Sequence, residues 1–83
     1  MKLLYFAWVR QKIGKGEEDV ALPPQVVTVA DLIAVLRNRG AGYAEAFEDE
    51  SRIRAALNQE HVRFDAKLGD HDELAFFPPV TGG

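Results

Sequence analysis

Apolar side chains recur at every second position near the start of the chain, over residues 2–10. This alternation predicts a β-strand whose two faces differ in character. The side chains expected to face the core are Leu3, Tyr5, Ala7 and Val9. The alternate set begins and ends with a cation, so we place it on the solvent side of the sheet. Three large apolar residues of that set would then be exposed or covered by a partner: Leu4, Phe6 and Trp8.

Turn and breaker residues divide the segment that follows. Gly14-Lys15-Gly16 predicts a hairpin turn, after which residues 17–22 return as an edge strand. Pro23-Pro24 ends this strand, because proline donates no hydrogen bond to a β-ladder. The glycines and the lysine lack the full spacing of a phosphate-binding loop, so we interpret them as a turn only.

The clearest helical signal lies between Thr28 and Gly40. Thr28 is a typical N-cap residue, and Asp31 follows it at the capping-box spacing. Arg37 and Arg39 fall in the expected last turn, where cations suit the helix dipole, and Gly40 is a natural C-cap. The apolar residues expected on the buried side are Leu32, Val35 and Leu36.

The rest of the chain predicts shorter elements joined by turns at Asn58-Gln59 and Gly69-Asp70. They are a helical turn at 43–47, a solvated loop at 48–51, and strands at 53–57, 61–64 and 73–77.

The first and last strands are the most apolar and are separated by a long crossover. We therefore expect them to lie side by side and parallel in the centre of a mixed sheet, with the main helix packed across one face. This is an α+β fold with the β-grasp (ubiquitin-like) arrangement. We expect a single domain over residues 1–83, with 78–83 as a flexible C-terminal tail.

Composition narrows the function classes. The net charge of −3 argues against nucleic acid or an anionic membrane as partner. No apolar run approaches the roughly 20 residues of a membrane span. The absence of cysteine excludes a disulfide framework, a thiolate zinc site and a cysteine nucleophile. We expect a cytoplasmic protein.

The C-terminal end carries the strongest chemical signal. Gly82 and Gly83 have no Cβ, so they can thread a channel too narrow for side chains. Pro78-Pro79 ends the last strand and stiffens the base of the tail, which lowers the entropy lost when a partner grips it. The terminal carboxylate of Gly83 is thereby held away from the body of the domain, in a position suited to activation by a partner enzyme.

Two further features suggest chemistry but have simpler interpretations. Asp70-His71-Asp72-Glu73 contains metal-binding side chains, yet they alternate between strand faces and no second cluster accompanies them. We interpret this segment as a solvated turn and expect no metal. His61 and His71 are paired with no nucleophile in the sequence, so we expect the isolated chain to be catalytically inert.

Residues 69–83, with the sequence GDHDELAFFPPVTGG, resemble the C-terminal signature of the MoaD family, the small sulfur-carrier subunits of molybdopterin synthase. Residues 4–10, LYFAWVR, and 56–59, ALNQ, also resemble that family. The similarity therefore covers the whole chain.

The resemblance implies a sulfur carrier in molybdenum cofactor biosynthesis. An ATP-dependent activating enzyme would adenylate the Gly83 carboxylate, and a sulfurtransferase would convert the acyl-adenylate to a thiocarboxylate. The tail would then enter the large subunit of molybdopterin synthase and donate its sulfur to cyclic pyranopterin monophosphate. The chain itself would bind no cofactor, because ATP is used by the activating partner, and it would be the non-catalytic subunit of the synthase.

The resemblance also implies the residues that partners contact. The gripped segment would be Phe77, Pro78, Pro79, Val80, Thr81 and Gly82. The docking surface would comprise Phe6, Trp8, His61 and Phe77. Alternation independently places Phe6 and Trp8 on the outward side, whereas we assign Phe76 to the core. His61 departs from the family, which commonly has an apolar residue at this place.

Three other functions remain open from the sequence. The chain could be a thiamine-pathway sulfur carrier, a ubiquitin-like protein modifier, or a non-covalent binding module that uses its apolar sheet face. Thiamine-pathway carriers share the Gly-Gly end but lack the Phe-Phe-Pro-Pro run. Deletion of Gly82-Gly83 separates the classes, because carriers and modifiers would lose all activity while a binding module would keep its affinity.

Overall fold

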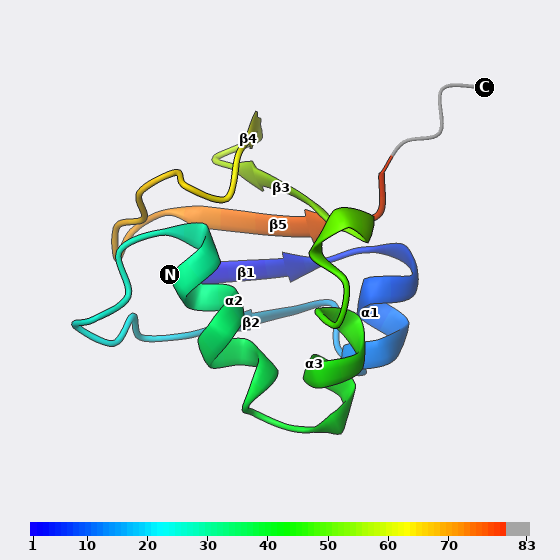
Figure 1. Ribbon diagram of the computed structural model, residues 1–83. Coiled ribbons are helices and arrows are strands. Elements are labelled where there is room, and N and C mark those ends of the chain that lie inside the picture. Colours follow the sequence, from blue (N-terminus) through cyan, green and yellow to red (C-terminus); the bar gives the residue numbers. More distant parts are fainter. Residues whose placement is uncertain (80–83) are drawn as a thin grey trace.

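The computed structural model describes residues 1–79, which form a mixed sheet of five strands with helices on one side and at one end (Figure 1). The elements are, in chain order, β1 (Lys2–Tyr5), α1 (Ala7–Ile13), β2 (Glu17–Asp19), α2 (Val29–Arg37), α3 (Ala41–Ala46), the 3₁₀-helix η1 (Glu50–Arg52), β3 (Arg54–Leu57), β4 (Glu60–Val62) and β5 (Glu73–Phe77). The sheet order is β2-β1-β5-β3-β4.

The first and last strands are confirmed as parallel neighbours inside the sheet, and the predicted β-grasp arrangement is confirmed with them. The other strand pairs are antiparallel. The register sets Leu3 beside Leu74 and Tyr5 beside Phe76, so that large apolar side chains share one face of the sheet. Because β1 and β5 are parallel, their C-termini lie at the same end of the sheet, where α1 begins (Figure 1).

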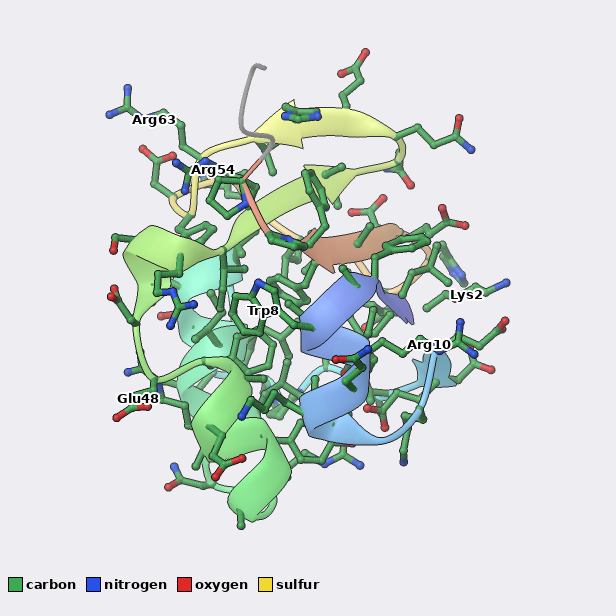
Figure 2. All side chains as sticks on the ribbon, turned by 90° about the vertical axis from the view of Figure 1, so that its right-hand side faces the viewer. Lys2, Trp8, Arg10, Glu48, Arg54 and Arg63 are labelled. Atoms are coloured by element: carbon green, nitrogen blue, oxygen red, sulfur yellow. The ribbon has the colours of Figure 1, made fainter. Side chains whose placement is uncertain are left out.

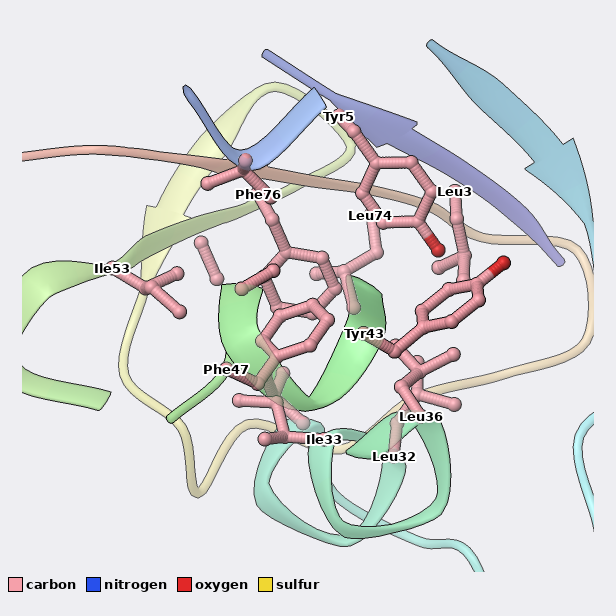
Figure 3. Close-up of a cluster of buried hydrophobic side chains, with 14 of the residues drawn as sticks. Leu3, Tyr5, Leu32, Ile33, Leu36, Tyr43, Phe47, Ile53, Leu74 and Phe76 are labelled. Carbon is pink, nitrogen blue, oxygen red and sulfur yellow. The ribbon is translucent and has the colours of Figure 1, made fainter. Parts of the chain in front are cut away.

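The core lies between this face of the sheet and α2 (Figure 3). Phe76 is fully buried, stacked 6.4 Å from the Tyr5 ring and edge-on to Phe47 at 5.0 Å. Such aromatic pairs add to the stabilisation gained from burial of their area. The assignment of Phe76 to the core is confirmed. The residues that α2 buries are Val29, Leu32, Ile33 and Leu36.

The predicted capping box of α2 is confirmed. The Thr28 hydroxyl accepts a hydrogen bond from the Asp31 N–H at 3.2 Å, and the Asp31 carboxylate accepts one from the Thr28 N–H at 3.0 Å. The predicted C-cap at Gly40 is wrong, because α2 ends at Arg37 with Asn38 as its cap. Gly40 is instead the N-cap of α3, and this helix confirms a helical segment close to the predicted 43–47.

The prediction of a strand over residues 2–10 is wrong beyond Tyr5. Ala7 has a φ of 52°, which turns the chain off the sheet, and the next residues form α1. Val9 is buried and Ile13, one helical turn later, packs against the core. A buried Val9 is compatible with the two-residue period of a strand and with the helical period, so alternation did not reveal the helix. Gly14 has a φ of 91° and ends α1 rather than making a hairpin turn. Ala7, expected in the core, is exposed.

Three other boundaries differ from the predictions. The edge strand spans 17–19 rather than 17–22, because its pairing ends where β1 begins, at Lys2. The expected loop at 48–51 overlaps η1, which is tied to α2 by the ion pair between Arg37 and Glu50. The strand expected at 61–64 is β4, since positive φ at Asn58 and Gln59 makes a two-residue turn and starts the pairing earlier.

Gly42 allows α3 to pack closely against α1. A Cβ at Gly42 would lie 2.3 Å from the carbonyl oxygen of Lys12, closer than side-chain carbons approach backbone atoms. The two short helices therefore pack backbone to backbone at the end of the sheet where β1 and β5 terminate. This packing holds α1, and Trp8 with it, in a fixed position.

Candidate functional site: the outer sheet face and the root of the tail

The face of the sheet opposite the core carries an apolar row across its central strands. Leu4 pairs with Ala75, and Ala75 pairs with Ala56 on the next strand. These residues alternate with the core set, so they point away from α2. Ala56 is only 9% exposed, yet it does not belong to the core cluster. We call this surface, with the residues at its tail end, the outer face. Its members are Leu4, Phe6, Ala56, Ala75 and Phe77.

Phe6 extends the outer face beyond the end of β1. Its backbone remains extended, with φ −126° and ψ 157°, and its N–H donates to the Phe76 carbonyl at 3.1 Å. The alternation of the strand therefore persists to this residue and sets it beside Phe77. The Phe6 side chain is 49% exposed, which is unusual for so large an apolar group and is typical of a surface that a partner covers.

His61 joins the outer face from β4. The register of β3 with β4 sets it beside Ala56, and its ring lies edge-on to Phe77 with the two ring centroids 5.2 Å apart. Three of the four residues that the sequence assigned to the docking surface thus lie together: Phe6, His61 and Phe77. Charged side chains border them, including Arg54, which is paired in register with Phe77.

Trp8 does not lie with the other three. It belongs to α1, where it is half-buried between this helix and the segment that carries α3 and η1 (Figure 2). The guanidinium carbon of Arg52 stands 5.2 Å from the centroid of its ring. Trp8, Ser51, Arg52, Pro78 and Pro79 line a hollow of about 310 Å³ at the root of the tail.

The tail begins at Pro78 and Pro79, which are half-buried where β5 ends. The remaining predicted site residues, Val80, Thr81, Gly82 and Gly83, lie outside the described residues. The outer face therefore leads directly to the root of the segment that is expected to carry the reactive carboxylate.

An acidic group that sequence reasoning missed lies on the opposite side of the sheet. The Glu18 side chain, 10% exposed, accepts hydrogen bonds from the hydroxyls of Tyr5 and Tyr43, each at 2.7 Å. It also pairs with Arg39 at 3.0 Å and Lys15 at 3.8 Å. Alternation could have revealed it, because Glu18 shares a strand side with Val20 and Leu22, which pack against the core.

The pKa of Glu18 follows from this environment. Burial by itself would raise the pKa, but the two tyrosine hydroxyls and the charges of Arg39 and Lys15 outweigh it and hold the pKa below its usual value. Burial and the hydrogen bond to Glu18 raise the pKa of both Tyr5 and Tyr43, so that each remains a donor. This network ties β2 to β1 and α3, so we assign it a structural role.

The acidic segment before β5 also has a structural role. The Asp72 carboxylate accepts hydrogen bonds from the Asn58 side chain at 2.9 Å and the Gly69 N–H at 2.8 Å, which closes the turn and lowers the pKa of Asp72. Within residues 1–79, no three metal-ligating side chains come together. Among the helices of that same stretch, none is both long and apolar enough to cross a membrane.

The comparisons with known proteins agree on one group. Residues 3–83 match the ThiS family. The chain is 44% identical to the molybdopterin synthase sulfur carrier subunit of Escherichia coli (strain K12), in an alignment that covers 100% of this chain and 99% of the relative. Subunit 1 of a molybdopterin converting factor from Pyrococcus furiosus is 35% identical, with a TM-score of 0.75 and 95% of both chains covered.

A third similar structure is that of an archaeal modifier protein. The crystal structure of small archaeal modifier protein 1 from H. volcanii is 27% identical to this chain and has a TM-score of 0.73, with 96% of this chain and 97% of that chain covered.

Proposed function

We propose, because this chain belongs to the ThiS family and within it to the molybdopterin synthase sulfur carrier subunits, that it carries sulfur on its C-terminal carboxylate for the synthesis of molybdopterin. The observation that carries the proposal is the position of the outer face. Among residues 1–79, no helix covers this apolar surface, which leads from Phe6, 49% exposed, to the root of the segment that contains Gly82 and Gly83. A surface of this kind suits a protein that presents its C-terminus to others.

The chemistry takes place at one carbon atom, the terminal carbonyl carbon of Gly83. In the proposed sequence, a carboxylate oxygen attacks the α-phosphorus of ATP held by an activating enzyme, and pyrophosphate leaves. Sulfide, which a thiol reductant releases from the persulfide of a sulfurtransferase, then attacks the acyl carbon, and AMP leaves. The resulting thiocarboxylate donates its sulfur to cyclic pyranopterin monophosphate in the large subunit. This chain contributes the carrier group and its delivery, and the partners contribute the catalysis.

The outer face supplies the docking energy in this scheme. Full burial of an exposed aromatic side chain is favourable by about 1.5–3 kcal/mol, and Phe6, which is 49% exposed, can gain about half of this under the large subunit. Pro78, Pro79, Val80, Thr81 and Gly82 would be the segment gripped by the partner's channel. Because the reaction consumes ATP, we place it in the cytoplasm, where ATP is available.

Intact mass spectrometry tests the proposal directly. The chain is incubated with its host's activating enzyme, ATP and a sulfur donor, and the control is the same chain without Gly83. We expect a mass gain equal to the exchange of one oxygen for sulfur, absent in the control. An unchanged mass with enzymes that load another carrier would refute sulfur carriage.

The resemblance to the archaeal modifier supports a second candidate, conjugation to other proteins. A modifier forms an amide bond between its terminal glycine and a lysine side chain, whereas a sulfur carrier leaves its acceptor without a protein adduct. In the same incubation supplemented with host lysate, higher-mass conjugates that disappear on deletion of Gly83 would favour the modifier. We expect thiocarboxylate and no conjugates.

A further inference from the structure

The start of α1 lies beside the root of the tail because of a single backbone turn. The positive φ of Ala7 directs the chain off the sheet immediately after Phe6. The Phe6 N–H still bonds to the Phe76 carbonyl at 3.1 Å, so the first turn of α1 is held next to the last residues of β5. Trp8, the second residue of the helix, is thereby carried to the place where Pro78 and Pro79 leave the sheet.

The orientation of Trp8 is fixed from two sides. On one side its ring packs against the core cluster. On the other, the guanidinium group of Arg52 covers the ring at 5.2 Å from its centroid. Arg52 ends η1, and this helix is itself braced, since Asp49 caps it through Ser51 and Glu50 pairs with a cation of α2 at 3.0 Å. A cation over an indole face is the strongest arrangement of its kind.

The hollow at this place brings three elements together. Its lining consists of Trp8 from α1, Ser51 and Arg52 from η1, and Pro78 and Pro79 from the root of the tail. Proline rings fix the φ of their own residues, but they do not fix the direction in which the pair leaves the domain. A rigid wall beside the two prolines does fix this direction, because it blocks the paths that lead back over α1 and α3.

We infer that Trp8, braced by Arg52, is a positioning residue that sets the direction in which Pro78-Pro79 leaves the domain and so presents the tail to the channel of the activating partner. The inference rests on the proposed function. A tail already directed outward loses less freedom when the channel takes it, which strengthens capture without altering the chemical step. Trp8 therefore acts through the tail rather than on the reacting atoms.

The first experiment needs no partner. Trp8 is the only tryptophan of the chain, so intrinsic fluorescence reports on it alone. Replacement of Pro78 and Pro79 by glycine should shift the Trp8 emission to longer wavelength and make acrylamide quench it more strongly. The matched control replaces the other proline pair, Pro23 and Pro24, by glycine, and should leave the emission unchanged. An identical spectrum in the tail variant, with the fold intact by circular dichroism, would overturn the inference.

The second experiment measures thiocarboxylate formation by the activating enzyme. For Trp8→Ala we expect KM to rise about tenfold with kcat little changed. Trp8→Phe keeps a flat ring and should restore most of the loss, while Arg52→Ala should raise KM and Arg63→Ala, at an exposed arginine in the loop after β4, should not. Wild-type KM in Trp8→Ala, or a fall in kcat alone, would contradict a positioning role. Failure of the wild-type chain to be loaded would refute the proposed function instead, and the fluorescence result would still decide the role of Trp8.

Discussion

The inner and outer faces of the sheet are made by alternate residues of the same strands, yet their exposure differs sharply. On the inner face, Leu3, Tyr5 and Phe76 are each at most 1% exposed, because α2 and α3 cover them. On the outer face, Phe77 remains half-buried and Phe6 is 49% exposed. Both faces are apolar, so hydrophobicity alone does not distinguish a core from a docking surface. What distinguishes them is which face the chain's own helices cover.

This comparison assigns different roles to adjacent residues. A residue on the inner face contributes to the free energy of folding, and under the proposed function its neighbour on the outer face contributes to the free energy of association. Substitutions at neighbouring positions should therefore affect different measurements.

Phe76→Ala should have the largest effect. It removes a fully buried ring that contacts Tyr5 and Phe47, and a change of this kind costs about 3–5 kcal/mol of unfolding free energy. That loss is a large share of the stability of a domain of this size. Urea denaturation followed by circular dichroism measures it, and the midpoint should fall steeply or the variant should be unfolded in buffer.

The matched variant is Phe77→Ala, one position along β5. Its unfolding free energy should change by less than about 1 kcal/mol, since the side chain is only half-buried. Its affinity for the large subunit of molybdopterin synthase, measured by calorimetry, should fall by about 2 kcal/mol or more. If Phe77→Ala unfolds the domain while binding by the folded fraction is unchanged, the division between the faces is incorrect.

Glu18→Gln should have an intermediate effect, with Glu17→Gln as its control. The register sets Glu18 beside Leu3 on the inner face and Glu17 beside Leu4 on the outer face. Glu18 accepts two tyrosine hydrogen bonds, whereas Glu17 makes an exposed ion pair with Lys2 at 3.4 Å. We expect a loss of about 1–3 kcal/mol for Glu18→Gln and less than about 0.5 kcal/mol for Glu17→Gln.

The pH dependence of stability tests the same pair. The folded-state pKa of Glu18 lies below its ordinary value of 4.5, so its stabilising contribution is fully present above that pH. The contribution is lost as the pH falls through the lowered pKa. The wild-type chain and Glu17→Gln should thus lose stability below pH 4.5 more steeply than Glu18→Gln does. Equal slopes would show that folding does not lower the pKa of Glu18, which would contradict a stabilising role for its ionised form.

Parts of this arrangement follow from the sequence because they depend on local, repeated signals. Thr28 and Asp31 predict the start of α2, and Pro78 marks the end of β5. Alternation assigned Phe6 to the outer face even though the strand ends at Tyr5, because Phe6 keeps an extended backbone. The same reasoning failed at Trp8, one residue past the positive φ of Ala7.

The failures share a physical cause, since they depend on contacts between distant segments. Alanine rarely adopts a positive φ, so nothing in the local sequence predicts the turn at Ala7, which we attribute to the packing of α1 against α3. That packing requires Gly42, whose closeness to Lys12 has no local signature. α2 ends at Arg37, before Arg39, and Arg39 pairs instead with Glu18, 21 positions away. Periodicity describes neighbours along the chain and contains no information about these encounters.

His61→Leu should have the smallest effect and should sharpen the comparison, because it changes the outer face in the opposite direction. His61 is exposed and touches the rim of the Phe77 ring, so a partner that covers the outer face must remove water from a polar imidazole. Leucine carries no such cost. We expect binding to the large subunit to tighten by about 1 kcal/mol, roughly fivefold, with little change in stability.

The control for this variant is His71→Leu, which alters the other histidine of the chain, in the turn before β5. It removes an imidazole from a site away from the outer face, so binding should remain at the wild-type value. Weaker binding by His61→Leu would mean that the imidazole is hydrogen-bonded in the complex. Equal binding by both variants would place β4 beyond the edge of the interface, and the docking surface would then consist of Phe6, Phe77 and the apolar row between β1 and β3.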